Sequence, residues 1–166
     1  MSDHAHDGVL DGSLFGEQQM CFGCGPSHPI GFRLAFERKG DEVLSRFVPD
    51  ERYQGPPGIF HGGLVMTLAD EVASWGVVML LGRFGFTGRV EGSLRKAIRI
   101  GREVVARATI AEDRRRIVDV AIRLEQDDAL CFEGKFRFMV LDEKGAERLL
   151  GGPLPERWKE LARQSG

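Results

Sequence analysis

A histidine, two glycines and a pair of adjacent carboxylates are the residues of this sequence best suited to chemistry. His61-Gly62-Gly63 comes directly before an apolar helical stretch, and Asp70-Glu71 lies within that stretch. A helix N-terminus presents unpaired backbone N–H groups and a partial positive charge, and glycines let a ligand approach the backbone. The helix start is therefore suited to stabilising a developing oxyanion, although loop-to-helix glycines also occur for purely geometric reasons.

The two carboxylates cannot serve the same purpose. A carboxylate within an apolar helix costs free energy unless it is paired, hydrogen-bonded or near water. Successive helix residues point about 100° apart, so we expect one of Asp70 and Glu71 to face a cleft and the other to face elsewhere. The structural alternative is a buried ion pair with an arginine of the following strand.

The element that positions these groups is a long helix over residues 64–81. Apolar residues cover nearly its whole circumference, and one narrow polar stripe interrupts them: Thr67, Asp70, Glu71 and Ser74. The stretch is long enough to raise the question of a membrane span, but two carboxylates at mid-bilayer would be costly. We expect a buried helix that Gly82 and Gly85 end.

Strand patterns flank the helix on both sides. Apolar and polar residues alternate over 32–37, and a turn leads into a second expected strand over 43–48. Four strand candidates follow Thr87, three of which alternate cleanly (104–112, 117–125 and 131–140). Short polar connections favour hairpins. The order predicts an α+β fold, in which an antiparallel sheet has one apolar face and one long helix covers that face.

Length and composition fit one ordinary domain. The chain has 166 residues, of which 42% are apolar and 29% charged, with a net charge of -2. A nearly neutral chain gives no electrostatic argument for nucleic acid. The polar, acidic start shows no signal peptide, so a cytoplasmic protein is expected. We divide the chain into a loose leader (1–20), the domain (21–140) and an extension (141–166), in which Pro155 could open a short helix.

Other chemical motifs are missing or weak. The sequence has no G-x-S-x-G nucleophile elbow and no G-x-x-x-x-G-K-[ST] phosphate loop. Cys21 and Cys24 form a single C-x-x-C with His28 nearby, and the third cysteine, Cys131, lies in an expected strand. With too few ligands for a structural zinc, we expect this pair to bind no metal and to pack as small apolar side chains in a turn.

Charge is concentrated in one segment. The segment from Arg83 to Arg116 contains ten Lys/Arg and four Asp/Glu, while the rest of the chain has more acidic than basic residues. Such a segment suggests an anionic ligand, for example a phosphate-bearing cofactor handle. A solvated, arginine-rich strand face is the equally open alternative.

The motifs resemble a known family. Tyr53-Gln54-Gly55-Pro56-Pro57-Gly58-Ile59-Phe60-His61-Gly62-Gly63, followed by Leu68-Ala69-Asp70-Glu71, is similar to hotdog-fold acyl-CoA thioesterases of the phenylacetate-pathway type. Cys21-Phe22-x-Cys24-Gly25 and Pro29-x-Gly31 resemble the N-terminal segment of many members. The resemblance covers residues 21–140 and implies an antiparallel sheet wrapped around one long central helix.

The resemblance also implies catalytic roles. The Gly62 amide would polarise the thioester carbonyl, and Asp70 would activate water or attack directly. Thr87 stands where relatives place a Ser or Thr that orients the water or the carboxylate. His61 would orient the carbonyl or assist the leaving thiolate.

Substrate contacts and partners follow from the same resemblance. Gly63 and Glu71 are the expected substrate-binding residues beside the catalytic ones, and Arg95 and Lys96 are candidate contacts for the phosphates of coenzyme A. The family site straddles a dimer, so we expect a homodimer or homotetramer that acts on acyl-CoA. No cofactor, metal, nucleic acid or membrane is expected.

Two other functions stay open at this stage. One is a non-catalytic acyl-CoA binding protein. The other is a hotdog enoyl-thioester hydratase, although such enzymes usually keep the catalytic histidine well upstream of the helix, whereas His61 directly precedes it.

Overall fold

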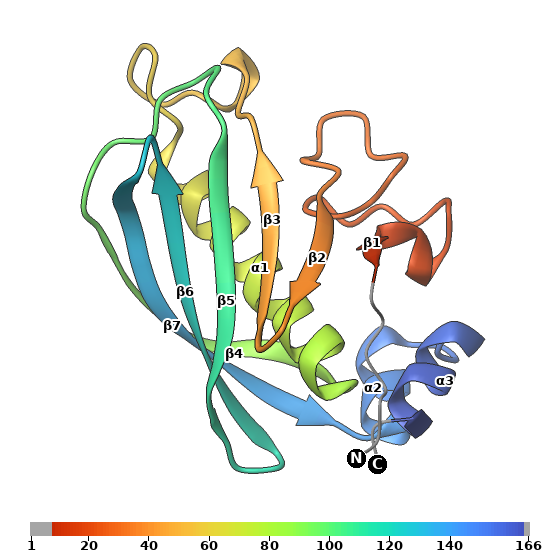
Figure 1. Ribbon diagram of the computed structural model, residues 1–166. Helices are drawn as coiled ribbons and strands as arrows, with labels where there is room; N and C mark the ends of the chain where they lie inside the picture. The colour runs from red at the N-terminus through yellow and green to blue at the C-terminus, as the bar shows by residue number, and fades with distance from the viewer. Residues whose placement is uncertain (1–7, 165–166) are drawn as a thin grey trace.

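Helix α1 (Gly62–Leu81) forms the centre of the molecule, as the computed structural model shows for residues 8–164 (Figure 1). His61 is its N-cap, and Gly82 follows it in the left-handed region (φ 57°), which a glycine adopts without a Cβ penalty. Half of its residues are buried, including Val65, Leu68, Val72 and Trp75. The predicted start, end and burial of the helix are confirmed.

One antiparallel sheet of seven strands packs against this helix, in the order β1-β2-β3-β5-β6-β7-β4. Buried and partly exposed residues alternate along the first half of β5, because successive side chains of a strand point to opposite faces, whereas β4 is exposed over most of its length. Their bounds are β1 (Val9–Asp11), β2 (Ala35–Lys39), β3 (Glu42–Phe47), β4 (Phe84–Leu94), β5 (Val104–Asp113), β6 (Ile117–Gln126) and β7 (Ala129–Leu141).

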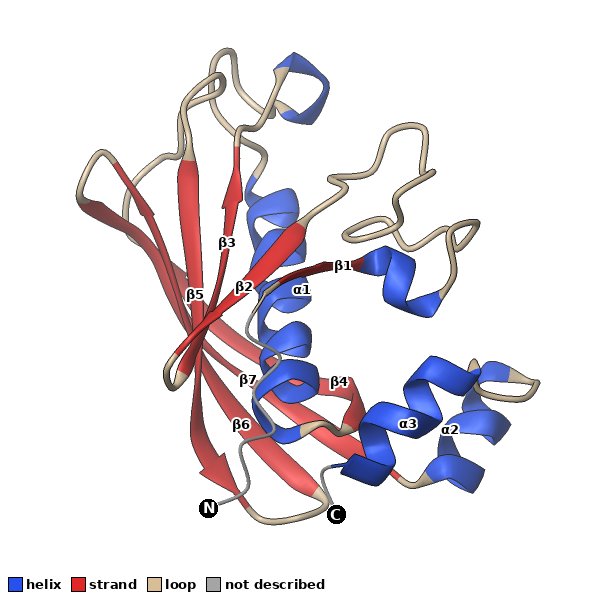
Figure 2. Ribbon diagram, turned by 45° about the vertical axis from the view of Figure 1, so that its right-hand side comes forward, coloured by secondary structure: helices blue, strands red, loops and turns tan. Residues whose placement is uncertain are grey.

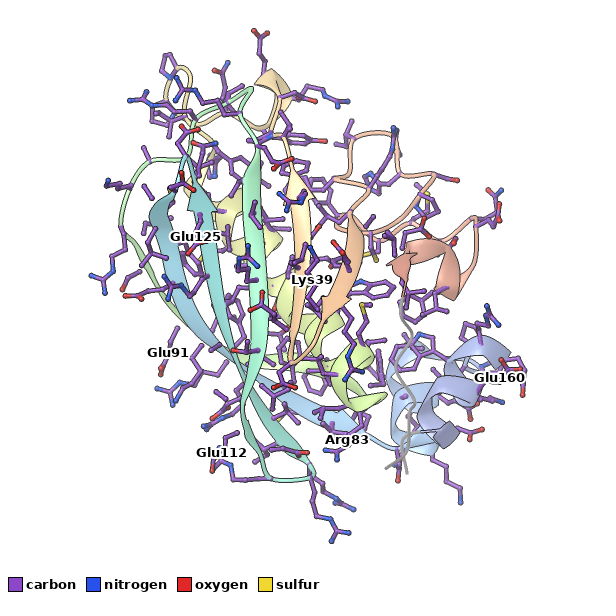
Figure 3. The ribbon with its side chains drawn as sticks, viewed as in Figure 1. Lys39, Arg83, Glu91, Glu112, Glu125 and Glu160 are labelled. Atoms are coloured by element: carbon purple, nitrogen blue, oxygen red, sulfur yellow. The ribbon has the colours of Figure 1, made fainter. Side chains whose placement is uncertain are left out.

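The two faces of the sheet differ as the alternation predicts. Val104, Ala106 and Ala108 of β5 are buried beneath α1, and the ring of Trp75 stacks on Phe36 of β2 with centroids 4.4 Å apart. The opposite face carries charged side chains, among them Glu91, Glu112 and Glu125 (Figure 3). The α+β hotdog arrangement is therefore confirmed.

The ends of the chain are more structured than the sequence predicts. The expected loose leader is wrong for residues 9–15, where β1 pairs with β2 and a 3-10 turn (Gly12–Phe15) follows; residues 1–7 lie outside the described residues. Phe15 anchors this segment, because its ring stacks on Trp158 with centroids 4.9 Å apart. A three-residue strand is too short to give a periodic pattern.

The C-terminal extension forms two helices, of which only one was predicted. Helix α3 (Glu156–Gln164) follows Pro155 as expected, and α2 (Glu143–Leu150) precedes it. Asp142 caps α2 and Gly151 ends it in the left-handed conformation, so both of its termini carry recognisable residues. Figure 2 shows α1 with the sheet on one side and the N-terminal segment on the other.

Among the described residues, α1 is the one helix with the length and hydropathy to cross a membrane. Its apolar residues pack against the sheet instead, and 56% of its most apolar window is buried. The helix is accounted for as the core of the domain.

Candidate active site

His61 is held in one orientation by the helix that it caps. Its Nδ1 accepts a hydrogen bond from the Gly63 N–H at 3.0 Å, while the side chain lies at an exposed position. In a neutral imidazole the nitrogen that accepts leaves the other to carry the proton. In that form, Nε2 of His61 is the hydrogen-bond donor.

The backbone of the helix start offers one free donor. The N–H groups of Leu64 and Val65 donate to the His61 carbonyl, and that of Gly63 donates to the His61 ring. Within the described residues the Gly62 N–H has no such acceptor. Gly62 and the ring of His61 thus present two N–H donors at the positive end of α1, and the Gly63 amide is not available to a ligand.

Asp70 lies two and a half turns further along α1 and faces strand β4. The Thr87 hydroxyl donates a hydrogen bond of 2.6 Å to its Oδ1. Burial raises the pKa of Asp70, and the hydrogen bond from Thr87 partly opposes that rise. The predicted association of Asp70 with Thr87 is confirmed, and an ion pair with an arginine of the next strand is not the arrangement found.

Glu71 faces away from this pair, as its position on the helix requires. Trp75, one turn later, donates its Nε1–H to Glu71 Oε1 at 3.2 Å, and Cys21 Sγ lies 3.5 Å from each carboxylate oxygen. Burial and the neighbouring Cys21 raise the pKa of Glu71 to about 7. The predicted divergence of the two carboxylates is confirmed; Glu71 lies apart from Asp70 and Thr87, and its role in substrate binding stays a prediction.

The two cysteines of the C-x-x-C differ strongly in acidity. A hydrogen bond from Cys24, with help from backbone amides, lowers the pKa of Cys21 to about 5. The same bond and burial raise the pKa of Cys24. The sequence around the two cysteines does not indicate that Glu71, fifty residues away, contacts Cys21. The contacts of Gln19 with Cys24 and of Trp75 with Glu71 were not predicted either. The one signal in the sequence is that a buried carboxylate such as Glu71 needs a partner.

Arg95 and Lys96 follow strand β4 and are exposed. Arg95 pairs with Glu133 of β7 at 2.5 Å. Leu94, which directly precedes them, lies at the helix start, because a Cβ added at Gly62 would be 3.3 Å from its Cδ1. Two cations in the segment after Leu94 suit a ligand that carries anionic groups.

Asp70 and the donors at the helix start do not converge within one chain. Eight residues separate Gly62 from Asp70, which corresponds to about 12 Å along the helix axis.

Comparison with known proteins agrees with this description. The family model of the Thioesterase superfamily matches residues 57–132, from the loop before α1 to strand β7. No curated protein sequence matches the chain.

Solved structures share the fold at low sequence identity. A thioesterase superfamily protein is 19% identical with a TM-score of 0.68, over 82% of this chain and 70% of that one. A thioesterase of Haemophilus influenzae is 23% identical with a TM-score of 0.61, over 67% and 80%. A hypothetical thioesterase of Streptococcus pneumoniae, solved with coenzyme A, is 18% identical with a TM-score of 0.60, over 63% and 86%. The family model thus covers the central part of the domain, and the solved structures share the hotdog fold of this chain.

Proposed function

We propose that the protein hydrolyses acyl-CoA thioesters to a free acid and coenzyme A. The proposal rests on the presence of two groups on α1: a free Gly62 N–H at its start, and a half-buried Asp70 that accepts a hydrogen bond from Thr87. One group stabilises negative charge and the other accepts a proton, which are the two needs of hydrolysis by water.

These groups supply the steps of thioester hydrolysis. Asp70 accepts a proton from a water molecule, whose oxygen attacks the thioester carbon. The carbonyl oxygen gains negative charge, which the Gly62 N–H and the Nε2–H of His61 stabilise by hydrogen bonds. The C–S bond then breaks and the coenzyme A thiolate leaves, taking up a proton as the acid is released. Direct attack by the carboxylate is the alternative first step.

The catalytic unit in this proposal is a dimer or a tetramer built from dimers. Strand β4 is an edge of the sheet, with β7 as its one neighbour, and it exposes Phe86, Val90 and Leu94 to 43%, 41% and 58%. A long, apolar edge strand is a template for pairing with another chain. Pairing there would bring a second copy close to Asp70, whose partner Thr87 lies on the same strand.

Recognition of coenzyme A is proposed on charge and on relatives. Arg95 and Lys96 provide cations in the segment after Leu94, and a structural neighbour was solved with coenzyme A. Of the subtypes, the phenylacetate-pathway type is proposed from the His61-Gly62-Gly63 motif with Asp70 eight positions after Gly62.

A thioester panel tests the proposal. The protein is incubated with acetyl-, phenylacetyl- and longer acyl-CoA while free thiol is followed, and with an enoyl-CoA while hydration is followed. Thiol release that is lost in Asp70→Asn supports the hydrolase. Hydration without thiol release would assign the enoyl-thioester hydratase, and tight acyl-CoA binding without turnover would assign the non-catalytic binder.

A further inference from the structure

Cys21, Cys24 and Glu71 form a compact group of three acidic side chains, which we call the thiol–carboxylate cluster. Their ligand atoms all lie within 4.8 Å of one another, and Cys21 Sγ is 3.5 Å from both oxygens of Glu71. Cys24 is 4% exposed, and the other two are partly buried. The proposed hydrolysis does not use this cluster.

Neutral N–H donors surround each member of the cluster. Trp75 donates to Glu71 at 3.2 Å, Gln19 Nε2 donates to Cys24 Sγ at 3.8 Å, and the amides of Gly23 and Cys24 hydrogen-bond to Cys21. Such donors orient and stabilise anionic ligands. Among the side chains that the structure describes (residues 8–160), no Lys, Arg or His pairs with any of the three, so these residues supply donors for negative charge but no cation to balance it.

The spacing of the ligand atoms fits a tetrahedral cation. With Zn–S near 2.3 Å and Zn–O near 2.0 Å, neighbouring sulfur and oxygen ligands stand about 3.5 Å apart, and two sulfurs about 3.8 Å apart. The observed distance from Cys21 Sγ to Glu71 matches the first of these. Two thiolates favour a soft divalent ion such as Zn²⁺ over Mg²⁺ or Ca²⁺.

The backbone of the loop is shaped around Glu71. The N–H of Gly25 donates to the Cys21 carbonyl at 2.8 Å and closes the turn between the two cysteines. A Cβ at Gly23 would lie 2.4 Å from Glu71 Cδ, so only glycine lets the loop approach the carboxylate this closely. The turn and the helix are therefore held with their ligand atoms on one centre.

We propose that Cys21, Cys24 and Glu71 bind one Zn²⁺ ion, with water in the fourth position. From the sequence alone, only the two cysteines are candidate ligands and no metal is expected. Glu71, from the middle of α1, is the third ligand. The ion balances the charge of the cluster and joins the N-terminal loop to α1. This site is independent of the proposed thioester hydrolysis.

Metal analysis of the whole protein, purified under reducing conditions without chelator, tests the site. Elemental analysis after incubation with Zn²⁺ and desalting should return about one zinc per chain. Cobalt substitution should give a thiolate-to-cobalt charge-transfer band. Cys21→Ser and Cys24→Ser should lose both signals, whereas Cys131→Ser, which changes a buried cysteine outside the cluster, should keep them.

Folding of the variants is checked separately. Glu71→Gln keeps the size of the side chain and both thiols, and it should weaken zinc affinity at least tenfold while circular dichroism stays that of the wild type. A chelator should lower the Tm of the wild type and leave that of Cys24→Ser unmoved. Less than a tenth of a zinc per chain in the wild type, full zinc in Cys24→Ser, or loss of zinc in Cys131→Ser would each overturn the proposal.

A disulfide is the competing chemistry of a C-x-x-C. Thiol titration under denaturing conditions should find three free thiols in the reduced, zinc-loaded wild type. Two thiols lost to a Cys21–Cys24 disulfide that re-forms in the presence of Zn²⁺ would also overturn the metal site. None of these measurements depends on thioester turnover, so the two proposals fail separately.

Discussion

Asp70 and Glu71 are neighbours in sequence, yet their surroundings differ in almost every respect. Asp70 faces the edge strand β4 and receives one hydrogen bond, from the Thr87 hydroxyl. Glu71 faces the N-terminal loop and is surrounded by Trp75 and two thiols. The 100° turn between successive helix residues is enough to give two carboxylates two different tasks.

Exchange of each carboxylate for its amide is the strongest test of this difference. Asp70→Asn should lower kcat for the best acyl-CoA substrate by about 10²-fold or more with a similar KM, because the amide cannot accept the proton of water. Glu71→Gln should cost far less in kcat. Steady-state kinetics on both variants decide the matter. Near wild-type turnover in Asp70→Asn with an inactive Glu71→Gln would mean that the catalytic acid is assigned one residue too early.

The next largest effect is expected at the helix start. Gly62→Pro removes the free N–H and adds a ring that the backbone can accommodate, since proline is favoured at the first helical position and His61 already has the extended backbone (φ −59°, ψ 129°) that precedes proline. Loss of one oxyanion donor should reduce kcat by about 10²-fold.

Gly62→Ala is the matched control, because it adds a side chain and keeps the N–H. Its kcat should stay within about threefold of the wild type. Equal losses in the two variants, with unchanged circular dichroism, would show that crowding against Leu94 and not the donor limits the rate.

The contrast between the carboxylates also separates what could be predicted from the sequence from what could not. Periodicity found α1 and four strands of the sheet, because alternation and helical spacing are local properties that burial imposes directly. The same reasoning required Asp70 and Glu71 to diverge. The pairing of Asp70 with Thr87 came from the family resemblance, since nothing in the spacing of seventeen residues fixes which strand crosses the helix.

What the sequence missed depends on contacts between distant segments. The 3-10 turn after β1 contains Phe15, which packs on Trp75 and, across more than half of the chain, on Trp158. The third member of the thiol–carboxylate cluster lies fifty residues from the first. Helix α2 is different, because Asp142 and Gly151 are recognisable cap residues and could have revealed it.

A smaller effect is expected when the one partner of Asp70 is removed. Thr87→Val deletes the hydroxyl that donates to Oδ1 and leaves a side chain of similar shape. The carboxylate loses its orientation, so kcat should fall about tenfold. Thr87→Ser keeps the hydroxyl and should retain most of the activity. If Val and Ser at this position behave alike in a kcat and KM comparison, the hydrogen bond does not position the acid.

Asp119 is a third carboxylate, on the charged face of the sheet. It is paired with arginine side chains, so its substitution should affect stability and not turnover. It is 1% exposed and binds the Nε and an NH2 group of Arg137 at 2.7 and 2.8 Å, with Arg114 at 3.2 Å. The hydrogen bonds from Arg137 hold the pKa of Asp119 below its ordinary value. Because the folded pKa is lower than the unfolded one, the stabilisation is complete above the unfolded pKa and is lost as pH falls through the folded pKa.

Asp119→Asn should therefore destabilise the protein at pH 7 and leave turnover within about twofold. The loss should be roughly 1–3 kcal/mol, less than for a fully buried pair, since the side chain of Arg137 is 31% exposed and water screens it. Urea unfolding of both proteins from pH 7 to pH 3 measures the difference, which should shrink in the acid range as Asp119 of the wild type takes up its proton. A difference that stays constant to pH 3 would mean that packing, and not the charge of Asp119, is what the substitution removes. If turnover of Asp119→Asn fell as much as that of Asp70→Asn, the proposed difference between the structural carboxylate Asp119 and the catalytic Asp70 would be wrong.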